Sequence, residues 1–464
     1  MRKVKILATL GPASNDRNVI EQMLNAGVDG VRLNFSHGDR DSHKAAYTAV
    51  REAAEALDRA VAVVADLQGP KIRVGNLDAP LKLEKGETVA IVPEESKGEG
   101  RTISCTYDRI ADDVSENDTI LIDDGRIELI AERIENNTVI CTVIEGGMVG
   151  EHKGINLPGV AVSAASITEK DEEDLKFSLD LGVDYIAVSF VRTGAGLRRV
   201  REIIQSEGRD IPVIAKIEKP EALENLDAII EESSGLMVAR GDLAVETSAE
   251  KVPILQKMIL KETNRRGKPD IVATQMLESM IEQSSPTRAE SADVANAVLD
   301  GADTLMLSGE TAVGKYPVQT VRMMDKIIRY AEESLYFEKH SYLPDRDDNS
   351  LLNGITHAAG LAADETRAAA LAVYSLTGEA ASMISQKRPD TDIIAFTPDA
   401  GLYNRFSLYY GVRPVMCERV TGWEKVIEYI SRECTDRKLL ARGDTVVCLI
   451  NDDRNNHILR IMSV

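Results

Sequence analysis

Two stretches, Ile211-Pro-Val-Ile-Ala-Lys-Ile-Glu218 and Gly235-Leu-Met-Val-Ala-Arg-Gly-Asp242, decide the fold. Each is an apolar run without helical period, typical of a strand buried on both faces, and each leads directly into charged residues. In a parallel sheet such residues gather at the carboxyl edge, where active sites lie. Two carboxylates beside a lysine and an arginine favour a divalent metal that holds an anionic substrate. Taken alone, the pattern fits two solvated loops equally well.

Six further runs share this character and each ends in polar residues. They are Val4–Leu10, Val28–Leu33, Ala60–Ala65, Val183–Val188, Asp270–Ala273 and Asp303–Leu307. Apart from one long interval, most successive strands end roughly 25 to 35 residues apart, which suits the eight strand–helix units of a (β/α)8 barrel. We therefore predict an α/β fold built on a TIM barrel, formed by residues 1–69 and 160–338.

The long interval, residues 70–159, has a different pattern. Short alternating runs such as Thr88–Val92 and Thr119–Ile122 are separated by turns of glycine, aspartate and asparagine, as in antiparallel strands. We predict a small β-barrel inserted after the third barrel strand. At that position it would overhang the carboxyl ends of the strands as a lid.

A second change of pattern follows the barrel. A polar linker, Ser341–Asn349, leads into residues 350–464, where strand-like runs alternate with helical stretches. These runs are Ala369–Tyr374, Asp392–Phe396, Val412–Val415 and Thr445–Ile450. The alternation predicts a separate C-terminal α/β domain.

Composition excludes several classes of function. The 464 residues carry a formal net charge of −21, which disfavours general binding to nucleic acid or to anionic membranes. No apolar stretch approaches the ~18 residues of a transmembrane helix. The five cysteines are scattered without a C-x-x-C pair, and no signal-peptide core is present, so we expect a reducing, cytoplasmic location.

Two common site types are also disfavoured. Gly309–Lys315 matches most of a P-loop, but Tyr316 stands where the Ser or Thr hydroxyl would be needed. None of the six histidines pairs with another at metal-ligand spacing. A metal site would therefore use oxygen ligands, which favours Mg²⁺ or Mn²⁺ over zinc.

Several long motifs stand in one order along the chain. They are Thr9–Ser14, Arg32–Gly38, Lys153–Gly159, Ile167–Asp171, Lys216–Glu218, Met237–Asp242, Ala273–Met280, Pro286–Glu290, Asp293–Val298 and Met306–Ala312. Together they closely resemble the pyruvate kinase family, across the whole barrel and into the inserted segment. The C-terminal domain resembles the family in the order of its elements but much less in its residues.

The resemblance implies a phosphotransferase of glycolysis that moves the phosphoryl group of phosphoenolpyruvate to ADP, giving ATP and pyruvate. It implies that Glu218 and Asp242 hold Mg²⁺. The catalytic residues would be Arg32 and Lys216 at the phosphoryl group, with Thr274 and Ser308 in a proton relay through water to the methylene carbon. The substrate carboxylate would meet the backbone amides of Ala239, Gly241 and Asp242, and Thr274 would also contact the substrate. The nucleotide would be approached by Asn34, His37, Arg73 and Lys153.

One residue departs from the common family pattern. The usual version holds K⁺ with residues matching Asn34, Ser36, Asp66 and the carbonyl of Leu67, next to a glutamate. Here Lys71 takes the place of that glutamate, and a tethered ammonium there would supply positive charge and repel K⁺. We predict an enzyme that needs Mg²⁺ but not K⁺. A solvent-pointing Lys71 beside an intact K⁺ site is the alternative.

The C-terminal domain carries the expected regulatory site. By resemblance, an effector site would lie at Ser375, Thr377 and Gly378, where a loop leads into a helix and suits an anion. Glu379 adds negative charge there, and the acidic segment Ile450–His457 lacks the family's Gly-rich effector loop. We therefore do not expect activation by fructose 1,6-bisphosphate; AMP, glucose 6-phosphate or no effector stay open. The resemblance also implies a homotetramer.

Two other readings compete with this one. A Mg²⁺-dependent barrel aldolase or lyase would share the metal carboxylates and an arginine, but it would not need the inserted domain or Lys216. A degenerate paralogue acting as a metabolite sensor predicts the loss of at least one of Lys216, Glu218, Asp242 and Thr274, and all four are present.

Overall fold

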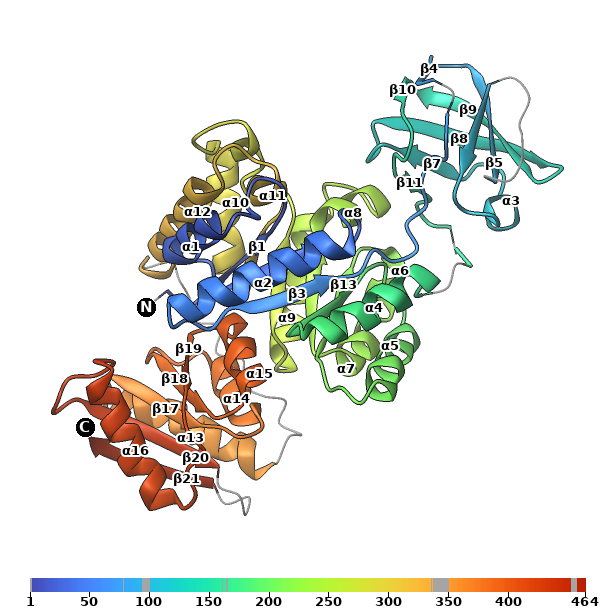
Figure 1. Cartoon of the computed structure of the whole chain (residues 1–464). Helices are drawn as coiled ribbons and strands as arrows, with labels where there is room; N and C mark the ends of the chain where they lie inside the picture. The colour runs from blue at the N-terminus through green and yellow to red at the C-terminus, as the bar shows by residue number, and fades with distance from the viewer. Residues whose placement is uncertain are drawn as a thin grey trace.

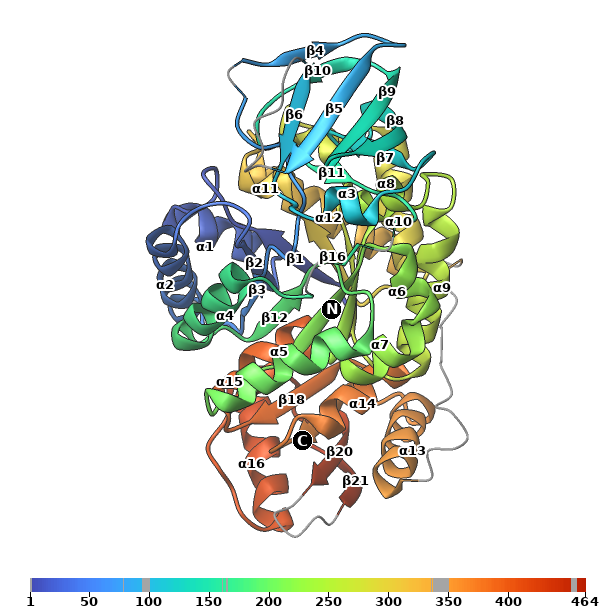
Figure 2. The same cartoon turned by 90° about the vertical axis from the view of Figure 1, so that its right-hand side faces the viewer.

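The computed structural model of the chain describes residues 2–77, 79–93, 101–160, 162–163, 166–334, 336, 350–451 and 457–464. These residues form three parts, a central barrel with one further domain at each end. Figure 2 shows the inserted β strands above the barrel and the C-terminal domain below it. The predicted linker Ser341–Asn349 lies outside the described residues.

The barrel is closed by eight strands. They are β1 (Lys5–Thr9), β2 (Gly30–Asn34), β3 (Ala62–Asp66), β12 (Tyr185–Val188), β13 (Val213–Ile217), β14 (Gly235–Ala239), β15 (Asp270–Ala273) and β16 (Thr304–Leu307). Their order around the barrel is β1-β16-β15-β14-β13-β12-β3-β2, and every neighbouring pair is parallel. The predicted TIM barrel is confirmed, because all eight apolar runs form its strands.

Helices surround these strands (Figure 1). They are α1 (Arg17–Ala26), α2 (Arg40–Ala56), α4 (Glu169–Leu181), α5 (Gly194–Ser206), α6 (Pro220–Glu224), α7 (Leu226–Glu232), α8 (Arg240–Glu246), α9 (Val252–Arg265), α10 (Arg288–Leu299), α11 (Gly309–Ala312) and α12 (Pro317–Glu332), with a 3₁₀ turn η1 (Glu278–Ile281). Three of the longer helices begin at capping boxes, with Asp39, Thr168 and Thr287 as the N-cap residues. Such caps satisfy backbone N–H groups that the first helical turn leaves free.

The inserted domain lies between β3 and β12. Its elements are β4 (Leu81–Leu83), β5 (Thr88–Pro93), β6 (Thr102–Cys105), α3 (Ile110–Asp113), β7 (Thr119–Ile122), β8 (Ile127–Glu135), β9 (Thr138–Glu145), β10 (Gly147–Val149) and β11 (Ile155–Asn156). In the described residues they form a six-stranded sheet, β11-β7-β8-β9-β5-β6, and a separate β4–β10 ribbon. The strands at the two ends of this sheet, β11 and β6, are not paired with each other in the described residues, so the predicted small barrel is not closed by hydrogen bonds between strands.

The C-terminal domain is a five-stranded sheet with helices. Its elements are α13 (Leu351–Glu365), β17 (Ala370–Tyr374), α14 (Glu379–Lys387), β18 (Ile393–Thr397), α15 (Ala400–Arg405), η2 (Phe406–Leu408), β19 (Val412–Met416), α16 (Trp423–Asp436), β20 (Thr445–Asn451) and β21 (His457–Ser463). The order is β19-β18-β17-β20-β21, with only the β20–β21 pair antiparallel. The four predicted strands are present, and β21 is an additional edge strand.

The C-terminal domain packs against the amino-terminal end of the barrel. Leu408 of η2 belongs to the apolar cluster that fills the barrel interior together with Leu7, Val64 and Met306. A Cβ at Gly30 would lie 2.9 Å from Leu408 Cδ2 and 3.1 Å from the carbonyl oxygen of Ala62, so a larger residue there would displace Leu408. Leu408 thus closes the floor of the barrel.

Among the described residues, no helix is both long and apolar enough to cross a membrane.

Candidate active site

Strands β2, β3 and β13 bring three charged side chains together at the carboxyl end of the barrel. Lys216 Nζ lies 3.3 Å from Asp66 Oδ1, and Arg32 Nε donates to Asp66 Oδ2 over 2.7 Å. Arg32 Nη1 also donates to Thr9 Oγ1 over 3.2 Å. The side chains of Arg32, Asp66 and Lys216 are only 11%, 1% and 10% exposed, so their charges act with little screening by water.

Lys216 is the centre of this network. Its Nζ donates to Ser189 Oγ over 2.7 Å and lies 2.9 Å from Glu218 Oε1. Burial alone would lower the pKa of Lys216, but the charges of Asp66 and Glu218 raise it above its ordinary value. Burial would likewise raise the pKa of Asp66, yet Lys216 and Arg32 hold it below its ordinary value. At neutral pH the site therefore holds a charged ammonium beside a carboxylate.

Glu218 is buried with one oxygen held by the backbone. Its Oε2 accepts from the N–H of Phe190 over 2.6 Å. Its Oε1 forms a buried ion pair with the Lys216 ammonium, 2.9 Å away. Burial first, and repulsion from Asp242 in addition, raise the pKa of Glu218 despite the attraction of Lys216. A cation placed at Oε1 would offset both effects.

Asp242 lies in the first turn of α8, directly after β14. Lys71 Nζ lies 3.6 Å from Asp242 Oδ1. The N–H of Gly241 donates to Thr274 Oγ1 over 2.8 Å. The structure therefore brings Lys71 to the second predicted metal carboxylate, and it joins the start of α8 to the end of β15.

Thr274 has a strained backbone, with φ of +69°, and Gln275 follows with φ of +55°. Positive φ is unfavourable for both residue types. Arg240 holds this turn, because its Nη2 donates to the carbonyls of Thr274 (2.7 Å) and Gln275 (3.2 Å) while its Nη1 pairs with Asp293 at 2.8 Å. Arg240 thus fixes the orientation of Thr274.

Ser308 follows β16 at the same edge of the barrel. Its N–H donates to Glu310 Oε2 over 2.7 Å. Its Oγ is buried without a hydrogen-bond partner in the described residues. A buried hydroxyl of this kind is available to water or to a ligand.

The predicted nucleotide residues divide between two parts of the molecule. Asn34 and His37 follow β2 on the barrel, and Arg73 and Lys153 belong to the inserted segment. Arg73 Nη1 donates to the carbonyl of His152 over 3.0 Å, and Lys153 Nζ lies 2.9 Å from Asp123 Oδ1. Burial and the charges of Arg73, Arg32 and Lys71 lower the pKa of His37. Arg73 therefore lies close enough to the barrel face to act on His37.

The predicted K⁺ ligands are engaged within the protein. Asn34 Oδ1 accepts from the N–H of Ser36 over 3.2 Å, and the carbonyl of Leu67 accepts from Ser189 Oγ over 2.7 Å. Both oxygens of Asp66 face cations, as described above. Lys71 is one-quarter exposed, and its described ion pair is with Asp242.

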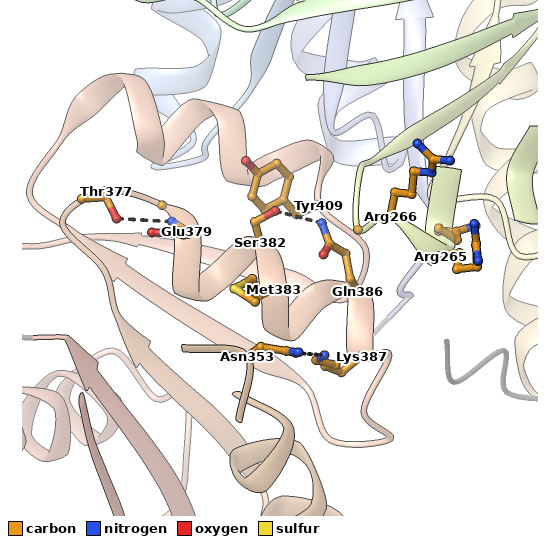
Figure 3. A pocket seen from close by; sticks show the side chains of 13 residues that line it. Arg265, Arg266, Asn353, Thr377, Glu379, Ser382, Met383, Gln386, Lys387 and Tyr409 are labelled. Atoms are coloured by element: carbon orange, nitrogen blue, oxygen red, sulfur yellow. Dashed lines mark hydrogen bonds between the residues drawn. The ribbon is translucent and has the colours of Figure 1, made fainter. Parts of the chain in front are cut away.

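The predicted effector residues lie at the start of α14. The N–H of Gly378 donates to Ser375 Oγ over 3.0 Å, and Thr377 Oγ1 accepts from the N–H of Glu379 over 3.5 Å. Thr377 and Gly378 line a cavity of about 590 Å³ between this helix and the barrel, whereas Ser375 is buried behind it. Figure 3 shows Arg265 and Arg266 on the barrel side of this cavity.

No individual role was predicted for three residues of the site: Ser189, Arg240 and Glu246. Arg240 was noted only as the arginine beside the two carboxylates. Ser189 directly follows β12 at the active edge, so its position after a strand end was an available signal. Arg240 and Glu246 act through hydrogen bonds to residues far away in the chain. No local pattern reveals such contacts.

Comparison with known proteins agrees with this geometry. The family model described as the pyruvate kinase barrel domain matches residues 1–321, and that of the pyruvate kinase alpha/beta domain matches residues 353–461. Pyruvate kinase from Mycobacterium intracellulare is 44% identical over 448 residues, which cover 96% of this chain and 94% of the relative. Pyruvate kinase from Corynebacterium glutamicum is 42% identical over 447 residues, covering 96% and 93%. Pyruvate kinase 2 from Synechocystis is 40% identical over 451 residues, covering 96% and 76%.

A buried lysine between two carboxylates at the open end of a TIM barrel, and matches that span nearly the whole chain, lead to one conclusion: the chain is a phosphotransferase and belongs to the pyruvate kinase family.

Proposed function

We propose that this enzyme transfers the phosphoryl group of phosphoenolpyruvate to ADP, giving ATP and pyruvate, with Mg²⁺ or Mn²⁺ as its metal and without K⁺. The observation that carries the proposal is the Lys216 ammonium, buried between Asp66 and Glu218 at the ends of the barrel strands. A buried positive charge stabilises the negative charge that develops on a moving phosphoryl group.

Arg32 supports the same step. Its Nε and Nη1 are held by Asp66 and Thr9, which fixes the plane of the guanidinium before substrate arrives. A fixed guanidinium matches phosphate oxygens and loses little freedom when it binds them. Arg32 and Lys216 therefore form a preorganised pair of cations on the barrel.

Glu218 and Asp242 fit a magnesium ion. Glu218 Oε1 is a buried carboxylate oxygen that faces the Lys216 ammonium, and the negative charge of Asp242 also acts on Glu218. No group of three or more His, Cys, Asp and Glu that could hold a metal occurs in that part of the chain, and Mg²⁺ is commonly bound by one or two carboxylates together with substrate oxygens. When bound, the ion acts as a Lewis acid toward the enolate and phosphate oxygens.

Protonation of the enolate carbon is assigned to Thr274 and Ser308, with water between them. A threonine hydroxyl is too weak an acid to act alone. In the structure Thr274 Oγ1 donates to the carbonyl of Ala273 over 2.6 Å and accepts from Gly241. The relay therefore requires Thr274 Oγ1 to give up its bond to Ala273 as substrate binds.

A coupled lactate dehydrogenase assay tests the reaction. With phosphoenolpyruvate, ADP and Mg²⁺ the enzyme should consume NADH, and chelation of the metal should stop this consumption. An aldolase or lyase would release pyruvate from another substrate without ATP formation, and a metabolite sensor would show no turnover.

We predict that K⁺ is dispensable. Lys71 places its ammonium at Asp242, inside the site, and Asp66 already faces two cations. Activity should be largely retained when K⁺ is replaced by a tetraalkylammonium ion, because the protein supplies the charge itself. Lys71→Gln should lose activity and recover part of it with added K⁺, whereas Lys71→Arg should stay independent of K⁺. A fall of the wild-type enzyme to a few per cent without K⁺ would reject this prediction.

We further propose an effector site at Ser375, Thr377 and Gly378, at the cavity shown in Figure 3. Gly378 has φ of +87° at the start of α14, and Arg265 and Arg266 lie across the cavity, which favours a phosphorylated ligand such as AMP or glucose 6-phosphate. The acidic segment expected to replace the family's effector loop falls mostly outside the described residues.

Fructose 1,6-bisphosphate should neither bind nor activate, because Glu379 in the first turn of α14 repels a second phosphate. Isothermal titration with fructose 1,6-bisphosphate, glucose 6-phosphate and AMP checks this expectation. The same titration of the Glu379→Gln variant with fructose 1,6-bisphosphate measures the effect of removing the Glu379 charge. Binding of the bisphosphate by the wild-type protein would contradict the prediction.

The domain boundaries, the homotetramer and the cytoplasmic location stay predictions. None of the five cysteines forms a disulfide in the described residues. Size-exclusion chromatography with light scattering would measure the oligomeric state.

A further inference from the structure

Glu246 is a buried carboxylate at the end of α8. Its Oε1 accepts two hydrogen bonds, one from Asn156 Nδ2 over 2.8 Å and one from Lys219 Nζ over 2.6 Å. The Glu246 side chain is 1% exposed and that of Lys219 is 13% exposed. Its Oε2 has no hydrogen-bond partner in the described residues. A buried charge of this kind is costly unless its partners are well placed.

The three residues come from three different elements of the site. Asn156 belongs to β11, where the chain returns from the inserted domain to the barrel. Lys219 directly follows Glu218. Glu246 lies one helical turn after Asp242 on α8. Glu246 Oε1 therefore connects the inserted domain to the two segments that contain the proposed metal ligands, Lys219 next to Glu218 and helix α8 with Asp242.

The connection lies at a crossing point between the two domains. The outgoing chain passes Pro70 and Lys71, and the returning chain passes Asn156. Both crossings line one narrow cavity together with Lys219 and Glu246. Asn156 and Glu246 are both buried there. Asn156 belongs to β11, the edge strand of the six-stranded sheet, and strands such as β8 and β9 lie farther from the barrel (Figure 1).

We propose that Glu246 is a positioning residue that anchors the crossing point of the inserted domain to α8, the helix that carries Asp242 in its first turn. Through this anchor, Arg73 and Lys153 of the inserted domain reach the nucleotide in a fixed relation to Glu218 and Asp242. The inference rests on the proposed phosphoryl transfer and on the proposed roles of those four residues.

The proposal makes an asymmetric prediction for the two substrates. The residues assigned to phosphoenolpyruvate lie on the barrel, whereas Arg73 and Lys153 belong to the inserted domain. Loss of the anchor should therefore weaken the handling of ADP and spare phosphoenolpyruvate. A residue needed only for folding would lower the amount of active enzyme and leave both KM values unchanged.

Asn156→Ala is the first test, because it removes the hydrogen bond from Asn156 Nδ2 to Glu246 Oε1 and leaves the Lys219–Glu246 ion pair in place. It should raise KM for ADP about tenfold, as expected for losing one buried hydrogen bond to a charged group. KM for phosphoenolpyruvate should change by less than about twofold. Calorimetry with Mg²⁺ and ADP should show the same weakening without turnover.

Glu246→Ala should give the same ADP defect, and the double variant should be no worse than Glu246→Ala in KM for ADP, because both changes remove one contact. Glu246→Gln should recover most of the wild-type KM, since its amide oxygen can still accept from Asn156. Glu221→Gln is the matched control, because Glu221 lines the same cavity and its described hydrogen bond uses only its backbone carbonyl.

A wild-type KM for ADP in Asn156→Ala would overturn the proposal. Equal increases in both KM values, or effects of Asn156→Ala and Glu246→Ala that multiply in the double variant, would also overturn it. If the wild-type enzyme itself fails to form ATP from phosphoenolpyruvate and ADP, the proposed function fails instead. ADP calorimetry still tests the anchor in that case.

Discussion

Lys216→Met is expected to abolish phosphoryl transfer while the protein stays folded. Cationic groups that stabilise a transferring phosphoryl group are worth about 10³-fold to 10⁵-fold in kcat, and Lys216 is the buried ammonium at this site. Methionine has a similar length and removes only the charge and its donors. The coupled assay measures the loss, and a variant with near wild-type turnover would refute the mechanism.

The same substitution removes a partner of two buried carboxylates, so its fold needs a control. Arg32 still pairs with Asp66, and the N–H of Phe190 still donates to Glu218. We therefore expect circular dichroism close to that of the wild type. Lys216→Arg keeps a positive charge but displaces the donor from Ser189 Oγ, so it should fold normally and still lose most activity. Equal loss of structure in both variants would point to a role in folding.

Arg388→Met is expected to give the largest loss of stability. Arg388 Nη2 donates to Asp303 Oδ1 over 2.6 Å and to the carbonyl of Gly301 over 2.5 Å, with both side chains of the ion pair less than one-tenth exposed. Asp303 also exchanges hydrogen bonds with buried Asp270. Breaking a buried ion pair by removing one partner costs about 3–5 kcal/mol. The melting temperature should fall accordingly.

This loss should grow with pH. Burial raises the pKa of Asp270 and of Asp303 above their ordinary values, and Arg388 opposes that rise in both. A carboxyl whose pKa is higher in the folded than in the unfolded state loses stability as pH rises from the unfolded to the folded pKa. Without Arg388 the folded pKa values rise further. The difference in melting temperature from wild type should thus be greater near pH 8 than near pH 5.

Two variants check the explanation. Adding Asp270→Asn to Arg388→Met should recover part of the stability, because it removes one buried negative charge and keeps an oxygen for the N–H of Asp303. Arg17→Met removes an arginine from exposed ion pairs with Glu21 and Glu52 and should change little. An Arg388→Met protein that melts with the wild type at both pH values would contradict the prediction.

The barrel was predictable because its strands leave a simple signal. Strands such as β13 and β14 are buried on both faces, so every residue is apolar until the polar end of the strand. That same rule places Lys216, Glu218 and Asp242 at one edge. The inserted domain was less predictable in detail, because alternation reveals strands but not which strands pair.

The direction of Lys71 illustrates a different limit. Lys71 stands where the family has a glutamate next to its K⁺ ligands, and this resemblance led to the prediction of an ammonium near them. The structure adds a partner that the sequence did not predict, Asp242, which lies 171 positions away along the chain. Contacts between strand ends depend on barrel closure, which no local pattern encodes. The anchoring contact of Asn156 with Glu246 escapes prediction for the same reason.

The position of Leu408 has a consequence for how this protein can evolve and be engineered. A side chain from the C-terminal domain completes the interior of the barrel, against a glycine that leaves room for it. A gene cut at the linker would encode a barrel with an open base, and water would reach side chains such as Leu7 and Met306. The C-terminal domain therefore cannot be removed without exposing the interior of the barrel. Any domain that replaced it would have to supply an apolar side chain at the position of Leu408.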